Sequence, residues 1–310
     1  MDLTLPFFVE VLIGGLLTGV MYALVALGFV LVFKASGIFN FAQGAMVLFA
    51  ALTYVGLLEL GTGAVLAFVL TALVMVLLAV AVERVVLRPL VNQEPIILFM
   101  ATIGIYYVLD GFGQMLWGSD IKALDLGIAS DPMTFLARPD APEGDPWKYG
   151  IMVNRFDLTA AAVAAVLVLA LALFFQKTRI GRALRAVADD HQAAQSVGIG
   201  LPAIWVIVWS VAGLVALVSG LAWGSKLGVQ FTLALITLKA LPVLILGGFT
   251  SVPGAIVGGL IVGAGEKLAE VFIGPLVGGA IEDWFAYMLA MLVLLVRPQG
   301  LFGERIIERI

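Results

Sequence analysis

The sequence contains no cysteine and a single histidine among its 310 residues. The lack of cysteine excludes disulfide bonds, thiolate metal sites and thiol catalysis, and one histidine excludes a metal site built from several imidazoles. Charge is also scarce, because 12% of the residues are charged, about half the share of a soluble domain. The net charge of -4 provides no basic surface for nucleic acid. Nothing in this composition points to an enzyme.

Apolar residues are abundant instead. They account for 62% of the chain, and the mean hydropathy is +1.13, which is too apolar for one soluble core. Uncharged runs fill residues 11–33, 35–58 and 60–82, and each can cross a hydrocarbon core of about 30 Å. Helices satisfy their own backbone hydrogen bonds in lipid, so we expect an all-α, polytopic membrane helix bundle.

Further spans are predicted at 95–117, 158–175, 203–223, 231–246, 252–272 and 283–296. The whole chain, 1–310, is therefore predicted to be a single transmembrane domain with about eight or nine membrane helices. Glycines between Gly14 and Gly19 predict close contact of the first span with another helix.

Charge in the connecting loops predicts the orientation. The loop 177–202 is the most basic, with Lys177, Arg179, Arg182 and Arg185 close together, and a short basic loop is typical of the cytoplasmic side. The acidic loop 118–157 then lies in the periplasm, and its four prolines argue against a long helix there. The same alternation places the N-terminus outside and the C-terminus inside.

The loop 177–202 also predicts a small docking helix that ends at Gly198. Two acids before it suit a helix N-terminus, where the helix dipole favours negative charge. No Walker A motif is present in the sequence, so ATP-driven transport would need nucleotide chemistry on another chain. We interpret the loop as the place where a soluble ATPase couples to the membrane part, through Arg182, Arg185, Asp189, Asp190, Gln192, Ala193, Ala194 and Gly198.

Two short polar breaks resemble each other. Residues 39–47 and 249–257 each place Gly-Ala-apolar-Val after a break between apolar runs. They predict two broken or re-entrant segments in pseudo-two-fold repeated halves, and paired interruptions of this kind indicate a transport site.

Each break offers candidate pathway residues. Asn40 and Gln43, beside Gly44, could hydrogen-bond a small polar solute, or they could only cap helix ends. Their aromatic neighbours Phe39 and Phe41 could form an apolar gate. Thr250 and Ser251 hold the matching place in the second break, and Ser251 could cap the helix that begins near Pro253.

Lys239 is the sharpest charged candidate inside a span. It could attract a solute carboxylate, or its side chain could reach from a helix end to the headgroups. Glu266, Lys267 and Glu270 lie at helical spacing, and we expect them to pair with one another. Lys239 is then nearly alone, which counts against a gradient-driven transporter with charged relays, and no cluster suits an intramembrane enzyme.

Several longer stretches are distinctive when taken together. They are GVMYALVALGF at 19–29, SGIFNFAQG at 36–44, ATIG at 101–104, WGSD at 117–120, GRALRA at 181–186, LKA at 238–240, GGFTSVPGA at 247–255 and RPQGLFG at 297–303. Through them the chain resembles, over nearly its whole length, the LivH-type permease subunits of branched-chain amino acid ABC importers.

The resemblance implies a multi-pass permease of the bacterial inner membrane with no cofactor of its own. It implies a second homologous permease, two ATP-binding cassette subunits carrying ATP and magnesium, and a periplasmic substrate-binding protein. Gln192-Ala193-Ala194 and Gly198 would form the coupling helix, although importers generally have Glu where Gln192 stands. Asn40, Gln43 and the break 247–254 would line or gate the pathway. The family includes permeases for urea and short amides, so that alternative stays open.

Overall fold

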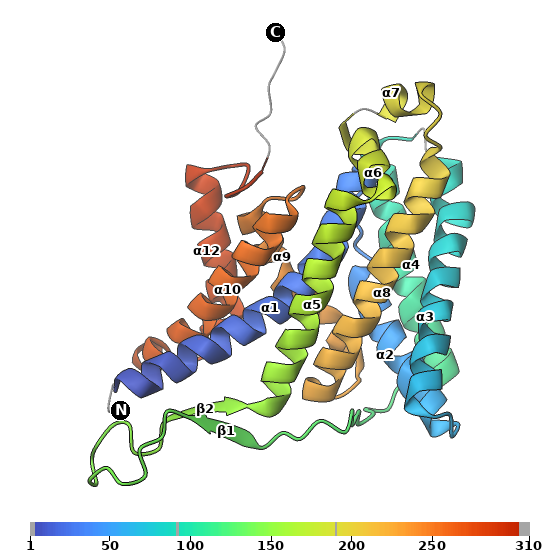
Figure 1. Cartoon of the computed structure of the whole chain (residues 1–310). Helices are drawn as coiled ribbons and strands as arrows, with labels where there is room; N and C mark the ends of the chain where they lie inside the picture. Colours follow the sequence, from blue (N-terminus) through green and yellow to red (C-terminus); the bar gives the residue numbers. More distant parts are fainter. Residues whose placement is uncertain (1–3, 91–92, 190, 304–310) are drawn as a thin grey trace. The chain divides into compact units, whose positions relative to one another are not determined.

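The computed structural model describes residues 4–90, 93–189 and 191–303, and Figure 1 shows that helices dominate them. The helices are α1 (Leu5–Ser36), α2 (Gln43–Glu59), α3 (Ala64–Ala81), α4 (Pro95–Trp117), α5 (Arg155–Lys177), α6 (Arg179–Asp189), α7 (His191–Ser196), α8 (Leu201–Leu227), α9 (Ile236–Gly247), α10 (Val252–Phe272), α11 (Gly274–Val277) and α12 (Glu282–Val296). A π-helical turn, Val82–Leu87, extends α3, and 3-10 turns occupy Arg88–Leu90 and Phe231–Leu235.

Within the described residues, five helical segments are long and apolar enough to cross a membrane. They are α1, α3 with its extension to Leu90, α4, α5 and α8. Phe231–Gly247 and Val252–Phe272 form a pair bent by 117° at a short break, which would raise the number of spans to six. The helix α2 and the segment Trp284–Val296 are shorter and apolar. The chain is therefore a polytopic helical membrane protein, and the count of eight or nine membrane helices stays a prediction.

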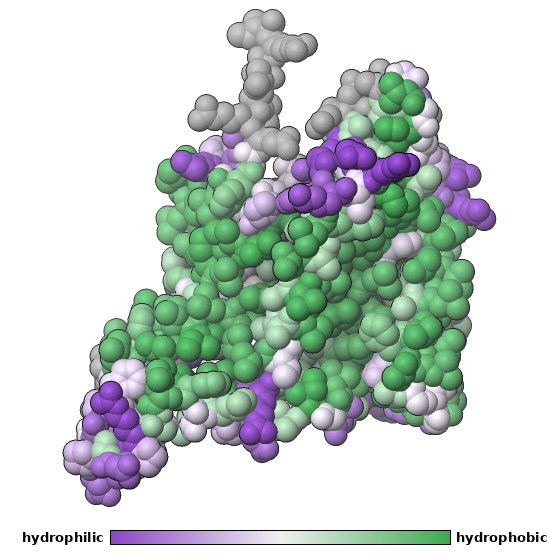
Figure 2. All heavy atoms as spheres, viewed as in Figure 1, coloured by the Kyte–Doolittle hydropathy of each residue, from purple (hydrophilic) through white to green (hydrophobic). Residues whose placement is uncertain are grey.

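The exposed faces of these helices suit lipid. Along α3, Val65, Val69, Leu73 and Leu77 are spaced four residues apart and are 81%, 56%, 53% and 58% exposed. This spacing places them on one face of the helix. Figure 2 shows apolar side chains covering the helix sides on the visible face, with hydrophilic residues gathered mostly at helix ends. A soluble protein rarely exposes apolar stripes of this extent.

The chain forms two compact units whose segments interleave in the sequence. The first unit contains Met1–Ala23, Gly127–Leu167 and Lys239–Ile310. The second contains Leu24–Leu126 and Val168–Leu238. The predicted repetition of two halves stays a prediction.

In the second unit, α8 packs against both α2 and α3. Small residues allow the close approach, because a Cβ atom added at Gly220 would lie 2.5 Å from the carbonyl oxygen of Val47. One at Gly213 would lie 3.3 Å from the backbone of Met75. As a result α2 is buried from Gln43 through Gly56, which explains how a polar glutamine can sit at its start without contacting lipid.

In the first unit, the glycines of α1 contact those of α10. A Cβ atom at Gly259 would lie 2.5 Å from the carbonyl oxygen of Gly19, and one at Gly15 would lie 2.7 Å from that of Gly263. The predicted close contact of the first span is thus confirmed, with α10 as its partner. Gly14 takes no part, since a Cβ atom there would meet nothing within 4 Å.

The loop after α4 contains a short antiparallel ribbon in the first unit. Strand β1 (Pro132–Phe135) pairs with β2 (Ile151–Asn154), with Met133 opposite Val153. No helix forms between residues 118 and 154, which confirms the expectation from the prolines. The side chain of Glu10 in α1 accepts a hydrogen bond of 2.9 Å from the Met152 N–H, so the ribbon is tied to the first helix of its own unit.

Candidate functional site

The first break, in the second unit, lies between α1 and α2. Gly37 turns the chain after α1 with a φ of +66°, a left-handed conformation that favours glycine. Asn40 and Gln43 are both 0% exposed. The Asn40 Nδ2 donates to Gln43 Oε1 at 3.1 Å, and Gln43 Nε2 donates to the Ala212 carbonyl of α8 at 3.4 Å. The two amides therefore join the break to a neighbouring helix.

One polar atom of this pair is left without a partner. Among the described residues, nothing donates a hydrogen bond to Asn40 Oδ1, although the atom is buried. Glycines press closely on the amides, because a Cβ atom at Gly28 would collide with the Gln43 side chain. At Gly44 it would lie 2.6 Å from Thr237 Oγ1. The arrangement offers one unused, uncharged acceptor in an otherwise tightly packed place, which suits a neutral N–H or O–H donor.

Aromatic side chains surround the same break. Phe39 stacks on Phe29 with ring centroids 5.2 Å apart, and it lies 6.1 Å from Phe99 of α4. Phe41 meets Phe99 edge-on at 6.1 Å and Tyr106 at 5.7 Å. The predicted apolar gate stays a prediction, but its two rings do belong to one aromatic group.

Thr102 is the residue at this break that sequence reasoning missed. Its Oγ1 accepts from the Phe41 N–H at 3.1 Å. Its one hydroxyl hydrogen has two carbonyls in reach, that of Phe99 in its own helix at 2.8 Å and that of Phe39 at 3.2 Å. A single hydroxyl from α4 thus contacts the backbone of the turn on both sides of Asn40. The stretch ATIG at 101–104 was part of the family resemblance, and this is the only signal that marked it.

The second break, in the first unit, lies between α9 and α10. The Ser251 Oγ accepts from the Gly254 N–H at 3.0 Å, and proline stands at the start of α10. The prediction that Ser251 caps this helix is therefore confirmed. Gly247 and Gly254 face each other so closely that a Cβ atom at either would collide with the other's carbonyl. Thr250 lies beside the cap and is partly buried.

Charged side chains gather elsewhere in the first unit. The Nζ of Lys239 in α9 lies 3.3 Å from Glu266 Oε1 of α10 and 3.4 Å from Glu282 Oε1 of α12. Lys267 Nζ lies 3.0 Å from Glu282 Oε2, and the Tyr22 hydroxyl donates to Glu266 Oε1 at 3.3 Å. These side chains connect α1, α9, α10 and α12.

The charge cluster corrects two expectations. Glu266, Lys267 and Glu270 do not pair with one another among the described residues, because each has a partner on another segment: Glu266 meets Lys239 of α9. Lys267 instead reaches Glu282, and Glu270 accepts the Glu282 N–H at 2.9 Å. Lys239 is not nearly alone, since it meets two carboxylates. A solute-binding role for Lys239 stays a prediction.

The basic loop belongs to the second unit. The predicted short helix is confirmed as α7, and Gly198 follows it with a φ of +88°. Arg185 donates from Nη1 to the Phe175 carbonyl at 2.6 Å, so it caps the last turn of α5. Arg182 is exposed and Ala194 is buried. Asp190, and the side chains of Asp189, Gln192 and Ala193, lie outside the described residues.

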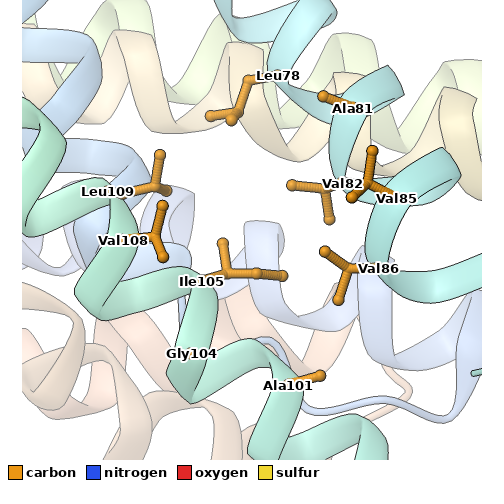
Figure 3. Close-up of a pocket in the computed structure, with 10 residues that line it drawn as sticks. All are labelled: Leu78, Ala81, Val82, Val85, Val86, Ala101, Gly104, Ile105, Val108 and Leu109. Carbon is orange, nitrogen blue, oxygen red and sulfur yellow. The ribbon is translucent and has the colours of Figure 1, made fainter.

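A cavity of about 430 Å³ also lies in the second unit, between α4 and the end of α3 with its π-helical turn (Figure 3). Its lining side chains are hydrocarbon, as the figure shows. They supply no hydrogen bond or charge for the ammonium and carboxylate of an amino acid, whose transfer to such a place is costly. The lining residues are Leu78, Ala81, Val82, Val85, Val86, Ala101, Gly104, Ile105, Val108 and Leu109.

Long apolar helices, a bent helix pair and buried polar groups define a polytopic helical membrane protein. Comparison with known proteins makes this assignment specific. Residues 11–297 match the family described as the permease component of branched-chain amino acid transport systems. The chain belongs to this family, and the resemblance noted in the sequence is confirmed.

Two curated relatives match almost end to end. The permease protein BraD of the high-affinity branched-chain amino acid transport system of Pseudomonas aeruginosa is 29% identical, with 98% of each chain covered. The corresponding LivH protein of Escherichia coli K12 is 28% identical, again with 98% of each chain covered. A solved structure, PsaBC from Streptococcus pneumoniae in complex with Fab, shares the fold with a TM-score of 0.50 and 14% identity, covering 96% of this chain and 98% of that one.

Proposed function

We propose that this chain is the permease subunit of an ATP-driven ABC importer for branched-chain or related hydrophobic amino acids. The observation that carries the proposal is the end-to-end match to permeases whose names state this transport. The chain would work in the bacterial inner membrane with a second homologous permease, two ATPase subunits and a periplasmic binding protein. Its N-terminus would face the periplasm and its C-terminus the cytoplasm.

The proposed mechanism is alternating access. ATP binding on the partner chains would favour one arrangement of the permease pair, and hydrolysis would release it. Such coupling requires nucleotide to bind the two states with different affinity. In this proposal α6 and α7 transmit the change, and the breaks before α2 and α10 are where the solute route opens and closes. Binding of ATP and magnesium would belong to the partners, and this chain would hold no cofactor.

A docking surface on α7 can be tested at Val197. This side chain is 75% exposed directly after α7, whereas Ala194 is buried and would report on folding rather than docking. The substitution Val197→Glu should abolish co-purification of the ATPases with the tagged permease. The matched control is Tyr149→Glu, since Tyr149 is 68% exposed in the loop predicted to face the periplasm. If both variants lose co-purification of the ATPases equally, or if neither variant loses it, the result would count against docking at α7.

The energy source needs its own experiment, because the charge cluster of Lys239 removes one argument against a gradient-driven transporter. The complex in proteoliposomes should accumulate leucine only with ATP and the ATPases present. Leucine uptake by this chain without ATP, driven by an ion gradient, would overturn the proposal.

A permease for urea or short amides is the second candidate. It is favoured by one observation, namely that the buried groups at the first break are uncharged amides with an unused acceptor on Asn40. Competition in the same uptake assay separates the two: excess isoleucine should suppress leucine uptake, and excess urea should not. The reverse result would favour the second candidate.

A further inference from the structure

Within the first unit, the chain that follows α12 turns back and reaches the last turn of α9. The Leu301 N–H donates to the Leu246 carbonyl at 2.8 Å, and the Phe302 N–H donates to the Gly247 carbonyl at 3.1 Å. Residues 297–303, called the strap below, thus form backbone hydrogen bonds with the last turn of a helix some fifty residues earlier. The strap coincides with the stretch RPQGLFG, for which the sequence suggested no role.

The end of α9 needs donors that its own helix cannot supply. The last four carbonyls of any helix lack intrahelical partners. Here the helix stops at Gly247 and α10 leaves at an angle of 117°, so the helix does not continue over them. Leu246 and Gly247 are buried, and an unpaired buried carbonyl is costly. The Gly248 N–H covers Leu244 at 2.9 Å, and the strap covers Leu246 and Gly247.

Two glycines make the contact sterically possible. Gly248 and Gly300 have φ values of +102° and +77°, where residues with a Cβ atom are strained. A Cβ atom at Gly300 would lie 2.8 Å from both the Gly248 nitrogen and the Ile245 carbonyl oxygen. One at Gly248 would lie 2.7 Å from the Gly303 nitrogen. Strap and break therefore approach through bare backbone on both sides.

We propose that the strap is a positioning element for the second break. It closes the open end of α9, holds the angle between α9 and α10, and so fixes the turn that carries Thr250 and Ser251. Because the donors come from beyond α12, the strap also ties α12 to the break. The link from this positioning to solute movement rests on the proposed function, whereas the positioning itself does not.

The first experiment removes one donor. The substitution Leu301→Pro deletes the N–H that Leu246 accepts, and Leu301→Ala retains that N–H while shortening the side chain. The probe is a cysteine introduced by Thr250→Cys, which is unique because the chain has no cysteine. In membranes without partner proteins or ATP, maleimide labelling at this position should be faster in Leu301→Pro than in the parent by roughly fivefold to tenfold, the size expected from one lost buried hydrogen bond. Leu301→Ala should label at the parental rate.

The second experiment measures the consequence for transport. In the proteoliposome complex, the number of leucine molecules imported per ATP hydrolysed should fall by a similar factor in Leu301→Pro and stay near the parental value in Leu301→Ala. A strap that only aids folding would lower the yield of complex and leave this ratio unchanged. The two proposals can fail separately. If the parental complex shows no ATP-driven uptake but labelling responds as expected, the proposed function is wrong and the positioning role of the strap is still supported.

A second pair of variants covers the case in which Leu301→Pro fails to fold. Gly300→Ala forces a Cβ atom against the break, whereas Gly278→Ala introduces one at a similar φ of +95° with nothing within 4 Å. Both carry backbone strain, but only the first pushes the strap away. Faster labelling at Thr250→Cys in Gly300→Ala alone supports the proposal. Equal labelling in the two glycine variants, or Leu301→Ala behaving like Leu301→Pro, overturns it.

Discussion

The ammonium of Lys239 and the carboxylate of Glu266 lie 3.3 Å apart at a place where Glu266 is 1% exposed. The same ammonium also meets Glu282. A carboxylate buried among membrane helices is costly unless a positive charge accompanies it. The lysine therefore provides the positive charge for two carboxylates in the first unit, and its removal should take an ion pair from both Glu266 and Glu282.

Replacing Lys239 by Met should destabilise the protein strongly. The substitution keeps the volume of the side chain and leaves the Glu266 carboxylate buried without its counter-charge, for a loss of about 3 kcal/mol in the free energy of unfolding. Unfolding of the purified permease in detergent with increasing denaturant measures this. Lys148→Met is the control, because its partner Glu143 is 97% exposed and the unfolding midpoint should not move.

Adding Glu266→Gln to Lys239→Met should restore much of that stability. The amide removes the unpaired buried charge and can still accept from the Tyr22 hydroxyl, which donates to Glu266 at 3.3 Å. A double variant as unstable as Lys239→Met would show that the loss came from packing and not from the ion pair.

Substitution of the glycines in α1 should separate contact from helix propensity. Gly19→Ala forces a Cβ atom into the backbone of α10 and should cost about 1–3 kcal/mol. Gly14→Ala meets nothing within 4 Å and should be neutral or stabilising by about 0.5–1 kcal/mol, because alanine is the better helix former. The same denaturant titration compares them. Equal effects at the two positions would contradict the packing of Gly19 on Gly259.

The amides at the first break should matter for uptake. Asn40→Ala removes the acceptor that is left unused, and Gln43→Ala removes the amide that holds Asn40 in place. Both should leave co-purification with the ATPases intact and reduce leucine uptake by roughly tenfold, the factor expected when one hydrogen bond to a solute is lost. Uptake and pull-down are measured on the same membranes. Parental uptake in both variants would mean that the amides serve only to hold α2 against α8.

The hydroxyl of Thr102 should be needed for the shape of that break. Thr102→Val keeps the volume but removes the hydroxyl that accepts from the Phe41 N–H. That N–H then has only the Phe39 carbonyl, at 3.1 Å, and the loss should be about 0.5–1.5 kcal/mol. Thr102→Ser keeps the hydroxyl and should behave like the parent in the denaturant titration. If valine behaves like the parent and serine is destabilising, the methyl group and not the hydrogen bonds supports the turn.

Local features of the chain were open to prediction from sequence. The uncharged runs 11–33 and 60–82 matched α1 and α3, whereas the run 35–58 contains the first break and the shorter helix α2. The glycines before Gly19 predicted a close helix contact, and Gly198 predicted the end of a short helix. Ser251 was predicted to cap the helix that starts beside Pro253. Each of these depends on a few neighbouring residues and on whether the solvent around them is lipid or water, so one sequence is enough.

Which residues contact each other in the folded protein could not be predicted from the sequence. The sequence offered no reason to pair Gly19 with Gly259, Gln43 with Ala212, or Leu301 with Leu246. It also predicted that Lys267 pairs with Glu266 and Glu270, whereas Lys267 pairs with Glu282. Such pairs depend on which helix faces fit together, and these faces come from segments far apart in the sequence. Many apolar faces in this chain have similar local sequence patterns, so the pattern does not tell which two faces meet. Sequence alone therefore determined that the protein spans the membrane and where it bends. The packed helices decided which buried polar group meets which, because an unpaired charge or carbonyl in lipid must find its partner wherever the fold places one.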